Sequence, residues 1–195
     1  MFEHSIKNLY VWEYKGFEFS YDFRNKTLAW VQADGWAFPE WTDWVAFDSN
    51  WMYKSAMWAK QTLYVIGSSI LQYANKVTLT DHQNKWYWDI DCILWFTSST
   101  NERIAYIYYW NGRSVYNLNW INKRDSYSTL ANWYYTQIIE VDFTISKITF
   151  TCWSNIQTFD MSASDIAALR TVTWINCSTC KSQSNYIPDI SITVE

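Results

Sequence analysis

Apolar residues recur at every second position along most of this chain, and this alternation limits the fold more than any other feature of the sequence. In residues 17–23, aromatic side chains occupy the odd positions and polar side chains the even ones, which is the pattern of a half-buried β-strand. A turn at residues 24–26 leads into residues 27–31. Residues 86–96 alternate as well, but their second face mixes acidic residues with apolar ones such as Trp95. Residues 190–194 close the chain with a last alternating strand.

Turn residues between alternating segments predict two hairpins. Residues 104–120 form the first, with Asn111 and Gly112 at its turn, because both central positions of a type I′ turn need positive φ. Residues 133–143 and 147–153 form the second, with residues 144–146 as the turn. Helix signals are few, and the best covers residues 162–170, where Ser162 or Ser164 is the expected N-cap.

Strands at 8–12-residue spacing without helical crossovers are typical of antiparallel sandwiches and barrels. No shift in composition marks a boundary within the 195 residues. The sequence therefore predicts an all-β protein, an antiparallel jelly-roll β-sandwich with at most one or two short helices, folded as a single domain over residues 1–195.

Composition and charge exclude several function classes. Aromatic residues make up 21% of the chain, which argues against disorder because such a chain can bury enough surface to fold. A net charge of -4 argues against nucleic acid as the partner. The N-terminus has no classical signal peptide, and no apolar stretch reaches the roughly 20 residues that a membrane span needs. We expect no membrane insertion and a protein that is intracellular at synthesis.

The last third of the chain carries two longer motifs. Residues 132–135 read Asn-Trp-Tyr-Tyr, and an acidic-hydrophobic strand over 138–143 and a returning strand over 147–150 follow them. Residues 186–192 read Tyr-Ile-Pro-Asp-Ile-Ser-Ile, with Pro188 where a first acidic residue is expected. Both motifs resemble those of the concanavalin A-like lectin/glucanase superfamily, the laminin-G-like jelly rolls.

This resemblance implies a non-catalytic recognition or assembly module that binds carbohydrate through aromatic side chains. We expect a lectin-like virion or surface-fibre structural protein with a role in adhesion, located on a virion or an extracellular surface. Its expected partners are glycans or other protein subunits, in a homo-oligomer or a larger assembly, and it needs no cofactor. Two alternatives stay open: a glycoside hydrolase of the same architecture and a purely architectural oligomer subunit.

The first hairpin contains the candidate ligand face. A two-residue loop pairs Tyr106 with Asn117, and residues paired across strands share a face. This face carries Tyr106, Tyr108, Trp110, Arg113 and Asn117, and the opposite, core face carries Ala105, Ile107, Tyr116, Leu118 and Trp120. Flat rings beside hydrogen-bonding groups suit the CH face and the hydroxyls of a pyranose. Packing against a second sheet or another subunit is the alternative.

A tryptophan-rich loop is the second candidate contact region. Trp36, Trp41 and Trp44 alternate there with acidic residues, and loops at the ends of a sandwich often carry function. An exposed aromatic cluster would bind a sugar or a protein. In the alternative interpretation, these tryptophans fill one end of the sandwich.

Two pairs of carboxylates are the candidates for catalysis and for metal binding. Glu140 and Asp142 resemble the start of the E-x-D-x-x-E strand of glucanases, but the second glutamate is missing, so no catalytic residue is predicted. Asp89 and Asp91 share a face, and calcium binding by them is an alternative to having no metal at all.

Four cysteines complete the candidate residues. Cys92 and Cys152 lie among alternating apolar residues and are predicted to be buried. Cys177 and Cys180 form a CxxC motif, for which zinc, a disulfide and reduced thiols all stay open.

Overall fold

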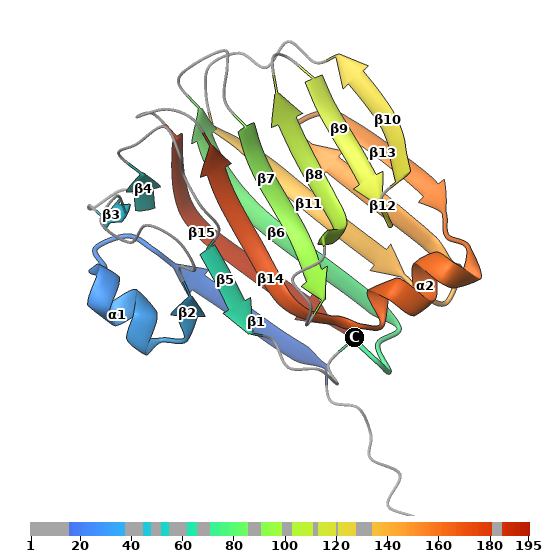
Figure 1. Cartoon of the computed structure of the whole chain (residues 1–195), viewed down its shortest axis with the longest axis horizontal. Helices are drawn as coiled ribbons and strands as arrows, with labels where there is room; N and C mark the ends of the chain where they lie inside the picture. Colours follow the sequence, from blue (N-terminus) through green and yellow to red (C-terminus); the bar gives the residue numbers. More distant parts are fainter. Residues whose placement is uncertain are drawn as a thin grey trace, which may run out of the picture.

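Two antiparallel β-sheets stacked face to face form the body of the molecule (Figure 1). This computed structural model describes residues 16–37, 45–47, 52–54, 62–65, 71–85, 91–98, 103–110, 113–119, 121–127, 134–180 and 185–195. Every strand pairing within these residues is antiparallel. The predicted fold class, an all-β jelly-roll sandwich with one or two short helices, is confirmed.

The first sheet has eight strands in the described part of the chain. They are β1 (Phe17–Asp22), β3 (Val45–Phe47), β4 (Met52–Lys54), β6 (Lys76–Lys85), β11 (Tyr134–Asp142), β12 (Lys147–Cys152), β13 (Asn155–Asp160) and β15 (Asn185–Val194). Their order is β13-β12-β11-β6-β15-β4-β3, with β1 also paired to β15. Gly16 lets β1 approach β15 closely, because a Cβ at this position would lie 2.7 Å from the Val194 carbonyl oxygen.

The second sheet has seven strands in the described ranges and lies in front in Figure 1. They are β2 (Trp36–Ala37), β5 (Thr62–Val65), β7 (Asp91–Ser98), β8 (Arg103–Trp110), β9 (Arg113–Leu118), β10 (Ile121–Tyr127) and β14 (Val172–Cys180). Their order is β10-β9-β8-β7-β14-β5-β2. Neighbouring strands in the middle of this sheet, β7 and β14, are distant in sequence.

Both predicted hairpins are confirmed. In the β8–β9 pair, Tyr106 lies opposite Asn117 and Trp110 lies opposite Arg113, which is the register expected for a two-residue loop. Strands β11 and β12 are joined by residues 143–146, where Ser146 has positive φ. The alternation of the last strand is also confirmed, since its inward-facing residues are fully buried: Ile190, Ile192 and Val194.

The core lies between the two sheets. Tyr116 of β9 stacks on Phe150 of β12, with ring centroids 5.3 Å apart and planes at 10°. Strand β12 shows the alternation most clearly, because Ile148, Phe150 and Cys152 are buried while the residues between them are not. This packing removes apolar side chains of both sheets from water and sets which face of each strand points inward.

The predicted C-terminal helix is confirmed as α2 (Ala163–Leu169). Ser162 is its N-cap, and the Ser162 side chain and the Asp165 side chain each accept a hydrogen bond from the other residue's backbone N–H. This capping box satisfies two backbone donors at the start of the helix.

A second helix, α1 (Leu28–Ala33), occupies residues that our strand-based interpretation of the sequence missed. Thr27 is its N-cap, with Oγ1 accepting a hydrogen bond from the Trp30 backbone N–H. The helix ends before Gly35, whose φ is 97°. β-branched Thr27 is a typical strand residue, but its short hydroxyl side chain also caps helices. Within the described residues, neither helix has the length and apolarity that a membrane span requires.

Arg170, the residue after α2, connects three parts of the chain. Its Nη1 donates hydrogen bonds to the backbone carbonyls of Leu71 and Ala74, at 2.5 and 2.7 Å. Its guanidinium carbon lies 3.5 Å from the centre of the Phe143 ring. Burial lowers the pKa of Arg170 from its usual value. The side chain therefore holds the loop before β6 and the β11–β12 turn against the end of α2.

We predict that Arg170→Ala lowers the melting temperature by roughly 5–10 °C, since charge-assisted hydrogen bonds contribute about 2–3 kcal/mol and this one also stacks on a ring. Thermal unfolding followed by circular dichroism would measure this change in melting temperature. Arg24→Ala is the control, because Arg24 pairs with Asp22 on the surface and such pairs contribute at most about 1 kcal/mol. Equal melting temperatures for the two variants would contradict the role of Arg170.

Candidate functional site

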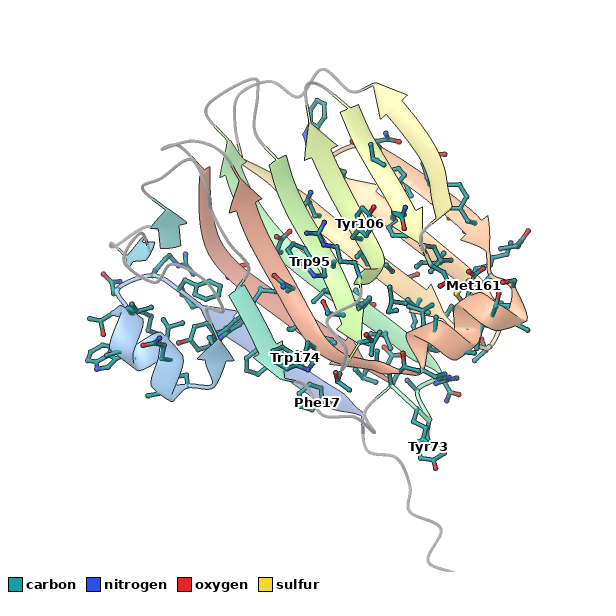
Figure 2. The ribbon with its side chains drawn as sticks, viewed as in Figure 1. Phe17, Tyr73, Trp95, Tyr106, Met161 and Trp174 are labelled. Carbon is teal, nitrogen blue, oxygen red and sulfur yellow. The ribbon has the colours of Figure 1, made fainter. Side chains whose placement is uncertain are left out.

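Two aromatic residues and two asparagines form one row across the seven-stranded sheet. Asn176 of β14 lies opposite Trp95 of β7, Trp95 opposite Tyr106 of β8, and Tyr106 opposite Asn117 of β9. Figure 2 shows the labelled side chains of Trp95 and Tyr106 next to each other on this sheet. We call these four residues the Trp95 row. Cross-strand neighbours have Cβ atoms roughly 5 Å apart, so the row is a continuous strip of two rings between two amides.

The row lies on the outer face, the face of the sheet that points away from the core. Leu94 and Phe96 belong to the hydrophobic core and Trp95 between them does not, because successive residues of a strand point to opposite faces. Nevertheless, only 1% of the Trp95 surface is exposed to solvent, and none of the Asn176 surface is. Tyr106 is partly exposed, so it is the ring of the row that a ligand in solution can reach first.

Several polar atoms near this row are buried without a partner. Within the described part of the chain, Trp95 Nε1, Thr97 Oγ1 and both amide atoms of Asn176 make no hydrogen bond. Buried polar groups are nearly always paired in native proteins, and each unpaired one costs about 1–3 kcal/mol. These atoms are fully buried, so a ligand on the outer face does not reach them in this conformation. The partly exposed side chains at this place are Arg103, Tyr106 and Trp174.

Arg103 covers part of the row. A bulge in the β7–β8 pair places Arg103 opposite Thr97, and its guanidinium carbon lies 5.0 Å from the centre of the Trp95 ring. At this separation, a cation is attracted to the face of an indole ring. Trp174 lies opposite Thr97 on the other side and is partly exposed (Figure 2). Rings, a cation and amides thus meet on a single face.

The structure describes the side chains of only some residues of the predicted ligand face. Tyr106 and Asn117 belong to the Trp95 row, although Asn117 is 3% exposed. Tyr108, Trp110 and Arg113 occupy the register positions that the sequence predicted, but their side chains lie outside the description. The opposite face is confirmed as core, since its described members are all buried: Ala105, Ile107, Tyr116 and Leu118.

Trp36, predicted as a contact residue of the tryptophan-rich loop, is buried at 2% exposure. Its ring centroid lies 5.3 Å from that of Tyr21 and 5.0 Å from that of Phe23. The Tyr21 hydroxyl donates to Asp34 at 2.6 Å, and burial, followed by this bond, raises the pKa of Tyr21 above its usual range. Trp36 therefore matches the alternative interpretation, in which it fills one end of the sandwich, while residues 41 and 44 lie outside the described chain.

The carboxylates considered for catalysis lie on the eight-stranded sheet, away from the Trp95 row. Glu140 forms an ion pair with Lys76 at 3.1 Å, and this bond raises the pKa of Lys76. Asp142 accepts hydrogen bonds from the backbone and hydroxyl of Thr144 at 2.9 and 2.6 Å, and the hydroxyl bond is the main cause of a lowered Asp142 pKa. Both acids thus have structural partners, on a sheet other than the one that carries the rings.

The structure tests the predictions about metal-binding residues and cysteines only in part. Asp89 lies outside the described residues and Asp91 is described by its backbone alone, so calcium binding there stays a prediction. Among described residues, no three His, Cys, Asp or Glu side chains form a metal-binding group. Cys152 is buried in the core, as predicted. The CxxC of 177–180 lies within β14, with side chains outside the description.

Sequence reasoning missed Asn176, Thr97 and Arg103. The available signal was Trp95, a large ring on the mixed face of a strand whose other face is already apolar. Its neighbour Asn176 comes from a strand 81 positions later in the chain (176 − 95), and no local pattern joins the two.

Comparisons with known proteins show the fold. No protein-family model matches the chain, and no curated protein matches it. Lectin I-B4 from Griffonia simplicifolia, in its metal-free form, aligns over 92% of this chain and 99% of its own, with a TM-score of 0.61 and 11% identity. The CBM2 module of the evolved Dit of Lactobacillus casei BL23 phage J-1 aligns over 91% and 90%, with a TM-score of 0.56 and 8% identity. The Crh5 transglycosylase aligns over 90% of this chain and 83% of its own, with a TM-score of 0.56 and 11% identity. The chain has the concanavalin A-like jelly-roll fold that its motifs resemble.

We predict that Asn176→Leu leaves the melting temperature unchanged or raises it by a few degrees. The substitution keeps the side-chain volume and removes two buried polar atoms that have no partner in the described structure. Thermal melts of both variants and the wild-type protein would measure the change. Asn176→Ala serves for comparison, because it leaves a cavity and is expected to be less stable. A loss of stability in Asn176→Leu as large as in Asn176→Ala would show that the amide is bound within the folded protein.

Proposed function

We propose that this protein is a non-catalytic carbohydrate-binding module, and that it binds glycans on the outer face of its seven-stranded sheet. The observation that carries this proposal is the Trp95 row, in which two adjacent rings lie between two amides on one face.

The chemistry of the row suits a sugar better than an ionic ligand. A pyranose presents a flat CH face, which stacks on an aromatic ring such as that of Tyr106, and a rim of hydroxyls, which both donate and accept hydrogen bonds. An amide offers both kinds of group, and asparagine occupies both ends of the row. Arg103, the cation described next to these rings, is itself placed over Trp95.

The likeness to known structures supports the same class of ligand by analogy. One similar structure is named a lectin and another a carbohydrate-binding module. Since this fold also occurs in a transglycosylase, the fold alone does not select a function, and the residues of the row carry the proposal.

The proposed surface extends toward the end of the β8–β9 hairpin. Tyr108, Trp110 and Arg113 follow the row in register, and we retain them as proposed ligand-binding residues. A run of aromatic residues along one strand would bind several sugar units of a chain rather than a single sugar.

The proposed setting is a virion or surface fibre, in which the module is part of a larger assembly or a homo-oligomer. The similarity to a module of a phage Dit protein supports this setting. Aromatic surface in such an assembly would either contact glycans or lie between subunits.

We predict that Tyr106→Ala weakens glycan binding about five- to ten-fold, because a stacked ring contributes roughly 1–1.5 kcal/mol. A glycan array on the purified protein, followed by calorimetry with the best glycan, would measure the loss. Tyr73→Ala is the matched control, since Tyr73 is 70% exposed and lies on the loop before β6, away from the row (Figure 2).

Trp110→Ala tests the extension of this surface, with light scattering on both variants to measure mass. Loss of binding at unchanged mass supports the glycan-binding proposal. A wild-type protein that binds no glycan and forms a multimer, which dissociates in Trp110→Ala or Tyr106→Ala, would make it an architectural subunit instead.

A further inference from the structure

Trp153 is held in a backbone conformation that its side chain disfavours. It is the first residue of the two-residue turn between β12 and β13, with φ of 55°. The other described non-glycine residues with positive φ are short and polar: Asn25, Asn119 and Ser146. Left-handed backbone is common for such residues but is an outlier for a bulky one, and two-residue hairpin turns favour Gly or Asn here.

Burial does not explain the choice of tryptophan at this turn. The Trp153 side chain is 48% exposed, and Ile156, three residues later, is 62% exposed. A half-exposed indole gains only part of the stabilisation of a buried one, and glycine or asparagine would relieve the backbone strain. Backbone strain of this kind clusters at functional positions in natural proteins.

The turn lies at the end of a row of polar residues on the outer face of the eight-stranded sheet. The Trp153 backbone N–H donates to the Thr136 carbonyl at 3.0 Å. Thr136 of β11 lies opposite His82 of β6, and His82 lies opposite Asp189 of β15. Strands are about 4.8 Å apart, so the three steps from Trp153 to Asp189 span roughly 14 Å. This length suits a short oligosaccharide rather than a single sugar.

The carboxylates along this row have partners within the protein. The His82 ring Nδ1 is hydrogen-bonded to the Asp189 carboxylate, and both side chains are partly exposed. Asp22, opposite Asp189 on β1, is paired with Arg24 at 2.6 Å. Since Arg24 neutralises Asp22 and the Asp189 carboxylate is hydrogen-bonded to the imidazole, the row offers mainly hydrogen-bonding groups, which suit the hydroxyls of an uncharged ligand.

We propose that Trp153, Thr136 and the His82–Asp189 pair form a second binding site, for an uncharged oligosaccharide, on the outer face of the eight-stranded sheet. The indole stacks on one sugar ring, and the hydroxyl and the imidazole–carboxylate pair bind hydroxyl groups further along the chain. The ligand class rests on the proposed function, but the site does not. With one site on each sheet, a single chain binds two glycans on opposite faces of the sandwich.

Calorimetry on the full chain tests this proposal with neutral hexasaccharides of glucose, mannose and xylose as probes. We expect two ligands per chain, falling to one in Trp153→Gly, whereas Tyr106→Ala weakens the other site by the factor predicted above. Trp30→Ala is the matched control, because Trp30 is 60% exposed on α1 and is expected to leave both sites intact.

Thermal stability separates a binding role of Trp153 from a structural one. Trp153→Gly and Trp153→Asn fit the left-handed backbone, so we expect an unchanged or higher melting temperature together with the loss of one ligand. A lower melting temperature in both variants would show that Trp153 stabilises the turn and would overturn the inference.

The remaining outcomes distinguish the two sites. If Tyr106→Ala abolishes all binding and Trp153→Gly changes nothing, the second site is wrong and the proposed function stands. If Trp153→Gly abolishes all binding and Tyr106→Ala changes nothing, the second site stands and the site of the proposed function is wrong. If none of the three hexasaccharides binds to the wild-type protein, both are wrong for this ligand class.

Discussion

Burial of one face of each strand between the two sheets is the interaction on which the rest of the structure depends. Because side chains alternate along a strand, the residues chosen for the core also decide which residues point outward. Ile107 and Tyr116 pack inward, with Tyr116 against Phe150, and this places Tyr106 and Asn117 together on the outer face. A slip of one residue in this register would exchange the core for the candidate binding surface. The geometry of the site is therefore held by residues that never touch a ligand.

The outer faces of the two sheets have different energetically unfavourable features. On the seven-stranded sheet, buried polar atoms of Trp95 and Asn176 lack partners in the described structure. On the eight-stranded sheet, Trp153 adopts a strained backbone while half of its ring is exposed. Each feature costs stability, and strained or unsatisfied groups cluster at functional sites in natural proteins. The core below them buries apolar side chains of both sheets, and this stabilisation offsets their cost.

The fold explains why sequence comparison finds so little while structure comparison finds so much. A sandwich of this kind requires alternation, turns at suitable spacing and a filled core, and many unrelated sequences meet these requirements. An identity of 11% with a lectin that aligns over nearly its whole length is consistent with this. The residues that would bind a ligand are outward-facing and face few such requirements, so they must be judged by their own chemistry.

Local patterns in the sequence determined the fold class, the register of the β8–β9 hairpin and the capped helix α2, because periodicity and turn or cap chemistry involve residues close together in the chain. The same reasoning missed α1, where Thr27 caps a helix instead of extending a strand. It proposed Tyr106 for the site but not Asn176, and it gave Trp153 no role. Only the tertiary structure decided that β14 lies beside β7 and that β15, β6 and β11 bring Asp189, His82 and Thr136 into one row. Sheet order depends on how all strands share one core, and that is a non-local free energy which no short stretch of sequence contains.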